Sequence, residues 1–132
     1  MKYELAPDVD KLAWDIIGKV GLYHIKLNRV VFVRSRGSKA KRTLARIHGL
    51  PKIMQLALGT KAFYAIELIS ENFDKLDERE KIKTVIHELM HIPKCFGGGF
   101  RGHRNYVNRK TVEDAFKTYV AASMTKDCIF KN

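Results

Sequence analysis

The chain has 132 residues and a formal net charge of +11, and 45% of its residues are hydrophobic. This length predicts one domain that spans residues 1–132. Its longest apolar runs, such as residues 63–69, are far shorter than the roughly 18 residues that a membrane span needs. The first residues also lack the apolar core of a signal peptide. We therefore expect a cytoplasmic protein that makes no membrane contact.

The first expected element is an amphipathic helix over residues 7–20, because apolar residues recur there every three or four positions. Asp8 and Asp10 near its start favour helix initiation. Trp14 is expected to anchor this helix against a sheet. Residues 28–34 are rich in β-branched and aromatic side chains, which predicts a strand in a covered sheet.

The positive charge is concentrated in residues 16–66, which contain eleven Lys or Arg and no Asp or Glu. The rest of the chain carries equal numbers of the two signs. Such a segment attracts polyanions through phosphate contacts and counterion release, so DNA is a candidate partner. A basic surface without a dedicated partner is the equal alternative. The candidate nucleic-acid contacts are Arg34, Arg36, Lys39, Lys41, Arg42 and Arg46.

Residues 52–58 and 62–69, which Gly59 and Thr60 separate, are interpreted as a β-hairpin. Residues 52–58 fit a short helix equally well, because Ile53, Leu56 and Ala57 also match helical spacing. If residues 63–69 form an edge strand beside the helix that follows, their backbone could pair with an extended peptide substrate. An internal strand is the equal alternative.

Residues 87–91 read His-Glu-Leu-Met-His, an HExxH motif, in a predicted helix that begins in the charged stretch 77–81. Positions four apart share one face of a helix, so His87 and His91 can both point at one metal ion. Glu88 lies beside that face, where a general base can take a proton from metal-bound water. The motif therefore predicts a hydrolase with one Zn²⁺ ion.

A catalytic zinc ion usually has three protein ligands and one open position. His103 is our candidate for the third ligand, because glycines 97–99 allow the chain to turn back toward the helix. Glu113 is the rival ligand, with Asp114 as its variant, in a predicted helix that begins at residue 107 or 111 and ends at 124. Both assignments stay open from the sequence.

Several side chains near the motif could stabilise the oxyanion that forms when water attacks a carbonyl group. The arginines that flank His103 could supply positive charge there. Sequence alone does not rank these candidates, which are Arg101, Arg104 and Tyr106, together with Tyr64 and Tyr119.

The stretch VIHELMHIPKCFGGGFRGHRNYV, residues 85–107, resembles archaeal and phage-type HExxH zinc metallopeptidases that are related to the SprT and Spartan-like peptidases. The resemblance extends over residues 45–120. It implies a compact zinc-peptidase domain in which His87, His91 and His103 bind the metal and Glu88 is the base. In the SprT group the glycine follows the third histidine, whereas here Gly102 precedes it.

The expected fold is a small α+β, zincin-like domain, with a short twisted sheet packed on helices and HExxH on the metal helix. The expected function is zinc-dependent hydrolysis of peptide bonds in peptide or protein substrates, in some cases in proteins bound to DNA. The alternative is a nucleic-acid-binding or structural domain in which the zinc site is not catalytic. A site with four protein ligands and no water would favour that alternative.

Overall fold

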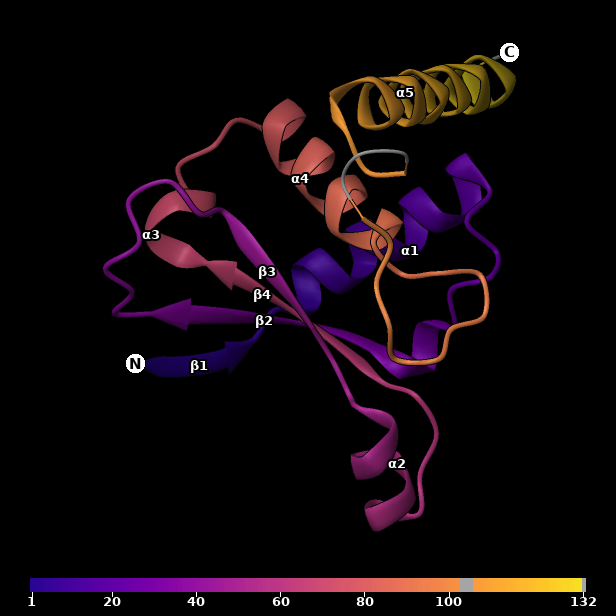
Figure 1. Cartoon of the computed structure of the whole chain (residues 1–132). Helices are drawn as coiled ribbons and strands as arrows, with labels where there is room; N and C mark the ends of the chain where they lie inside the picture. Colours follow the sequence, from indigo (N-terminus) through magenta and orange to yellow (C-terminus); the bar gives the residue numbers. More distant parts are fainter. Residues whose placement is uncertain (103–105, 132) are drawn as a thin grey trace.

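The structure, a computed structural model, has an α+β architecture in which helices cover one face of a four-stranded sheet (Figure 1). It describes residues 1–102 and 106–131, with side chains through residue 124. The strands are β1 (Lys2–Leu5), β2 (Val30–Arg36), β3 (Ala45–Gly49) and β4 (Tyr64–Ile69). The helices are α1 (Pro7–Val20), α2 (Lys52–Leu58), α3 (Ser70–Phe73), α4 (Glu78–Met90) and α5 (Arg109–Lys131), and a 3₁₀ turn over Leu27–Arg29 precedes β2.

The strand order is β1-β2-β4-β3. β2 and β4 are parallel and pair Phe32 with Ile66, whereas β1 and β3 run antiparallel to their neighbours. β4 is therefore an internal strand, and of our two alternatives for residues 63–69 the internal one is confirmed. The edge strand that packs against α4 is β3.

Residues 52–58 form helix α2, so the hairpin prediction is wrong and the helical alternative is confirmed. Gly59 ends the helix in the left-handed conformation with φ 64°, and its backbone N–H donates to the carbonyls of Gln55 and Leu56. Helical spacing therefore outweighed the strand propensity of this stretch. Strands β1 and β3 were not expected from the sequence.

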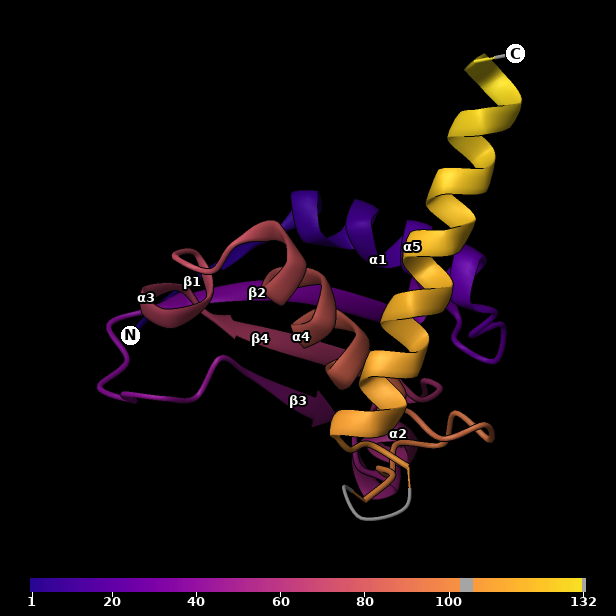
Figure 2. The ribbon, with the colours of Figure 1, turned by 90° about the horizontal axis from the view of Figure 1, so that it is seen from above.

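Helices α1 and α4 pack on the same face of the sheet, and α5 lies across them (Figure 2). The core between these layers contains Ile16 of α1, Phe32 of β2 and Leu89 of α4. Trp14 is 51% exposed, so the prediction that it anchors α1 is wrong. Trp14 lies beside the helical face that carries the buried residues of α1, and it is this face that packs on the rest of the domain.

Polar contacts fix α1 and α4 in place. The backbone N–H of Phe32 donates to Asp10 at 2.9 Å, which ties α1 to β2. Asp77 caps the start of α4 by accepting from the N–H of Glu80 at 2.9 Å. The first contact positions α1, and the second stabilises α4, the helix that carries the HExxH residues.

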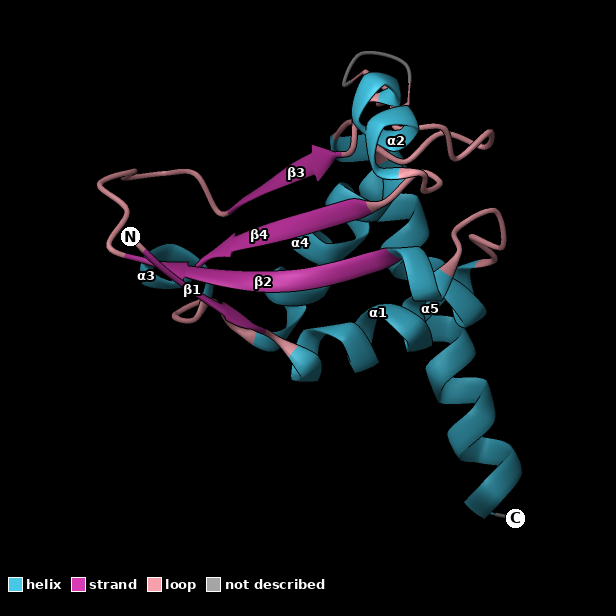
Figure 3. Cartoon of the chain, turned by 90° about the horizontal axis from the view of Figure 1, so that it is seen from below, coloured by secondary structure: helices cyan, strands magenta, loops and turns pink. Residues whose placement is uncertain are grey.

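The opposite face of the sheet is not covered by these helices, as the view from below shows (Figure 3). Helix α2 projects on that side, beyond the ends of β3 and β4 (Figure 1). Among the described residues, no helix is both long and apolar enough to cross a membrane.

Candidate active site

The HExxH residues lie at the end of α4, with His87, Glu88, Leu89 and Met90 in the last turn and His91 as the C-cap residue. The Nε2 atoms of His87 and His91 are 3.3 Å apart. Two nitrogens that each lie about 2.0–2.1 Å from a tetrahedral zinc ion are themselves about 3.3 Å apart. The spacing of the two imidazole nitrogens therefore matches that of two ligands of one zinc ion.

The loop after α4 fixes the orientation of His91. The backbone N–H of Arg101 donates to the His91 carbonyl at 2.8 Å, and His91 Nδ1 contacts the Arg101 carbonyl at the same distance. A carbonyl can only accept, so Nδ1 carries the proton and Nε2 of the neutral ring keeps its lone pair for a metal. The predicted return of the chain through the glycines is confirmed at Arg101.

Close backbone packing holds this loop against the sheet. A Cβ atom on Gly49 would lie 2.6 Å from the Gly98 carbonyl oxygen, and Gly98 has a φ of 101°, which favours glycine. The buried Tyr64 hydroxyl accepts from the N–H of Gly98 at 2.8 Å and donates to the Gly99 carbonyl at 2.8 Å. The sheet thus positions the loop that orients His91.

Glu88 lies beside the two histidines and is only 7% exposed. Burial raises the pKa of its carboxyl group to about 7, because a charged carboxylate loses hydration there. A bound divalent cation would favour the charged form and lower this pKa again. A carboxyl group of this kind can accept a proton and release it.

A cleft runs along β3 on both sides of His87 and Glu88. One cavity, of about 650 Å³, lies between the start of β3 and helices α4 and α5. The other, of about 390 Å³, lies between Arg46 of β3 and the loop residues Phe100 and Arg101. His87 and Glu88 line both cavities, so they stand at the middle of the cleft.

No described strand pairs with the outer edge of β3, which presents backbone groups along this cleft. Leu44 and Leu50 hydrogen-bond to the backbone of residues 69 and 63, next to the β3–β4 pairs. Residue pairs between antiparallel strands alternate between hydrogen-bonded and non-hydrogen-bonded pairs. Ala45, Ile47 and Gly49 are in non-hydrogen-bonded pairs, so their N–H and C=O groups point away from β4. These groups can pair with an extended polypeptide.

Of the two main candidates for the third ligand, the structure describes Glu113 and not His103. His103 lies outside the described residues, and so does Arg104. Among the described side chains, those of residues 1–102 and 106–124, no group of three or more His, Cys, Asp and Glu is arranged to hold a metal ion. The Glu113 carboxylate is bound by the Lys83 ammonium group in the wall of the larger cavity. The choice of His103 stays a prediction.

Of the proposed oxyanion stabilisers, Arg101 lines the cleft beside His87, Glu88 and His91. Its guanidinium carbon lies 5.1 Å from the centre of the Tyr106 ring, so the two side chains form a cation–π contact. Tyr119 lies elsewhere, where its hydroxyl donates to Asp15 at 2.6 Å. Tyr64 is buried and supports the loop.

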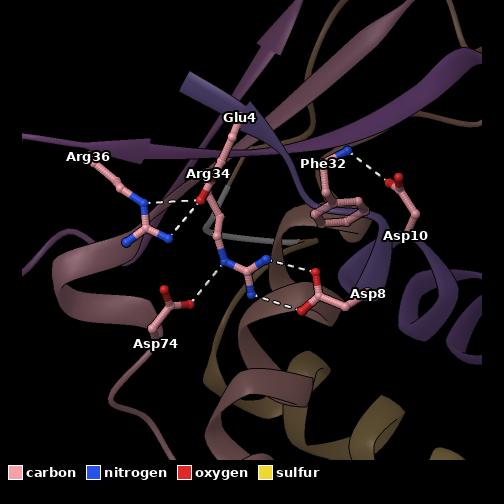
Figure 4. Close-up of polar contacts among 7 residues, drawn as sticks. All are labelled: Glu4, Asp8, Asp10, Phe32, Arg34, Arg36 and Asp74. Carbon is pink, nitrogen blue, oxygen red and sulfur yellow. Dashed lines mark hydrogen bonds and ion pairs between the residues drawn. The ribbon is translucent and has the colours of Figure 1, made fainter. Parts of the chain in front are cut away.

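Two of the six candidate nucleic-acid contacts are held by carboxylates (Figure 4). Arg34 donates to Asp8 at 2.7 and 2.9 Å and to Asp74 at 3.1 Å, and Arg36 donates to Glu4 at 2.7 Å.

The other four candidates lie at or near the start of β3. Arg46 lies 3.8 Å from the buried Glu67. Lys39, Lys41 and Arg42 are exposed and form no ion pair with the described carboxylates. The two residues that follow them, Thr43 and Leu44, line the larger cavity, so these three cations are close to one end of the cleft.

Sequence reasoning missed the contribution of β3 to the cleft. The signal was the alternation of Ala45 and Ile47 with Arg46 and His48, which is typical of a half-buried strand. We considered this stretch only as part of the basic segment, with Arg46 as a candidate nucleic-acid contact. The close contact between Gly49 and Gly98 left no signal in the local pattern.

The family comparison agrees with this site. A family model described as "Putative phage metallopeptidase" matches residues 1–122, and the chain belongs to this family. No curated protein and no solved structure gives a match. The expected relation to the SprT and Spartan-like peptidases stays a prediction.

Proposed function

We propose that the protein is a zinc-dependent peptidase with a zincin-like active site. The observation that carries this proposal is the pair of converging Nε2 atoms of His87 and His91, with the buried Glu88 beside them in a cleft. Membership of the phage metallopeptidase family supports a metal-dependent peptidase. The zinc ion, His103 as its third ligand, and the fold relationship to zincins are parts of the proposal.

The residues of the chain have separate roles in this reaction. His87 and His91 hold the metal through Nε2, and the Arg101 carbonyl keeps His91 in the required tautomer. Zinc bound there supplies Lewis acidity, which activates water and polarises the scissile carbonyl. The Glu88 carboxylate would take a proton from the attacking water and pass it to the amine nitrogen as the C–N bond breaks. Arg101 is placed to stabilise negative charge on the carbonyl oxygen.

The substrate would lie in an extended conformation along β3. The outward backbone groups of Ala45 and Ile47 would pair with its backbone, and this pairing would hold the scissile bond near Glu88. Backbone pairing gives affinity with little dependence on side chains, so the cavities on each side would set sequence preference.

The test is the Glu88→Gln variant. We expect it to bind zinc like the wild type and to lose hydrolysis of unfolded protein by orders of magnitude, because the amide cannot accept the proton. Glu78→Gln, an exposed change in the first turn of the same helix, is the matched control and should keep full activity. Normal turnover by pure Glu88→Gln would refute the role of Glu88.

Metal content separates the candidates for the third ligand. We expect His103→Ala to lower the zinc bound per chain, and Glu113→Ala to leave it unchanged because Lys83 occupies that carboxylate. The opposite pattern, measured by elemental analysis after dialysis, would assign the ligand to Glu113.

DNA is proposed as an additional partner, which would direct the peptidase to proteins bound to DNA. The supporting observation is the exposed cation group Lys39, Lys41 and Arg42 beside the larger cavity. Replacing all three by alanine should reduce the salt slope of DNA binding by up to about 2.7, at about 0.9 for each phosphate contact. The matched control removes three exposed lysines elsewhere, namely Lys11, Lys75 and Lys94. Equal slopes for both variants would reject a dedicated site.

A further inference from the structure

Helix α2 is an exposed apolar element for which the peptidase chemistry gives no role. Its four large apolar side chains are between 43% and 85% exposed, and no residue of the helix is buried. These side chains are Ile53, Met54, Leu56 and Leu58. Large apolar side chains left exposed together on one short helix are a common mark of a binding site.

Helix α2 is held in its exposed position by hydrogen bonds between the α2 segment and the rest of the molecule. Gln55 donates from Nε2 to the Leu50 carbonyl at 2.7 Å and to the Gly97 carbonyl at 3.1 Å. Arg29 donates from Nε to the Ala62 carbonyl at 2.8 Å and from its NH2 group to the Thr60 hydroxyl at 3.0 Å. Both ends of the α2 segment are therefore held, and its apolar side chains are presented to the outside.

The position of α2 continues the line of the cleft. Strand β3 ends at Gly49, and α2 begins three residues later. Phe100, which lines the smaller cavity, lies against Gly49 and is 51% exposed. A polypeptide paired with the edge of β3 would leave the cleft over Phe100 and meet α2.

The charge around α2 limits what can bind there. The exposed Lys52 is the first residue of α2, the exposed Lys61 follows the end of the helix, and residues 16–66 contain no acidic residue. This arrangement favours an apolar segment with carboxylates beside it and disfavours one with lysines.

We propose that α2 and Phe100 form a second docking surface for the substrate polypeptide, which binds an apolar, acid-flanked segment of unfolded chain outside the cleft. The proposal rests on the proposed peptidase function, because it takes the substrate of that peptidase to be the polypeptide in the cleft. It predicts a preference for long, unfolded substrates over short peptides, because only a long chain reaches both the cleft and α2.

Binding can be measured without hydrolysis in the zinc-loaded Glu88→Gln protein. The probe is fluorescein-labelled, reduced and carboxymethylated α-lactalbumin, an unfolded acidic polypeptide, and the readout is fluorescence anisotropy. Adding Ile53→Gln and Leu56→Gln should raise the Kd by about tenfold, which corresponds to about 1.4 kcal/mol of lost apolar contact. Glutamine is a good helix former, so α2 should persist.

The matched control adds Leu5→Gln and Met124→Gln, which remove two exposed apolar side chains from β1 and α5. We expect this control to bind the probe within twofold of the parent. A second α2 variant, Ile53→Ser and Leu56→Ser, guards against an effect of glutamine itself. An unchanged Kd in both α2 variants, or equal weakening in the control, would overturn the proposal.

Two further measurements separate the other possible occupants of α2. Sedimentation that shows a wild-type dimer and a monomeric α2 variant would assign the surface to a second copy of the chain and overturn the proposal. Cleavage of the unfolded probe by the zinc-loaded wild type, with Glu88→Gln as the inactive reference, tests the peptidase function on its own. If the wild type leaves the probe intact but probe binding depends on α2, the docking surface stands and the peptidase function fails.

Discussion

Replacing Gly49 with alanine should destabilise the protein and weaken zinc binding together. The added Cβ would lie 2.6 Å from the Gly98 carbonyl oxygen, whereas ordinary contact begins at 3.4 Å, so the loop must move by about 0.8 Å. The rings of Phe100 and Tyr64 lie 3.1 and 3.2 Å from the same position and block a sideways adjustment. Overpacking of this kind costs about 1–3 kcal/mol of unfolding free energy.

The same movement would reach His91, the proposed metal ligand. If the shift is passed on fully, the 2.8 Å contact between His91 Nδ1 and the Arg101 carbonyl lengthens to about 3.6 Å, which is no longer a hydrogen bond. Loss of such an outer contact typically lowers metal affinity by about 10–100-fold. Gly49→Ala should therefore show a similar loss of zinc affinity.

Two assays measure these effects separately. Urea denaturation of the metal-free protein gives the stability, and competition with a chromophoric chelator gives the zinc affinity. Gly99→Ala is the matched control, because no atom lies within 4 Å of its added Cβ, and it should match the wild type in both assays. Wild-type stability and zinc affinity in Gly49→Ala would refute the link from β3 to His91.

Three further predictions concern the parts that support the site. Tyr64→Phe removes both hydrogen bonds to the glycine loop and should lower the unfolding free energy by about 1–3 kcal/mol in urea denaturation; an unchanged midpoint would contradict the role of Tyr64. Asp77→Ala removes the cap of α4 and should cost about 1 kcal/mol, measured in the same way, and a neutral effect would show that the cap is dispensable. The hydrogen bond from Arg34 lowers the pKa of Asp8 below its usual 3.8, so the stability from this pair is present above pH 3.8 and is lost as the pH falls through the lowered value. Asp8→Asn should therefore flatten the fall of stability below pH 3.8, and a fall as steep as that of the wild type would disprove this contribution.

The local sequence pattern was sufficient to predict an element where the residues that define it lie within one segment. The helix over residues 7–20 was predicted with the bounds that α1 has, because its apolar face and first-turn acids lie within one segment. The strand at residues 28–34 was recognised within two residues at each end. For residues 52–58 the pattern left two elements open, since a seven-residue stretch satisfies both periods.

The sequence by itself determined the chemistry of the candidate site, because HExxH places two imidazoles and a carboxylate on one helical turn through covalent spacing alone. Only the tertiary structure decided what surrounds that turn. It made β3 the edge of the cleft, brought the Arg101 carbonyl to His91, and left α2 exposed beyond the end of β3. These contacts join residues that are ten to fifty positions apart in the sequence. Packing between the layers of the fold brings them together, and the local periodicity of apolar residues does not encode that packing.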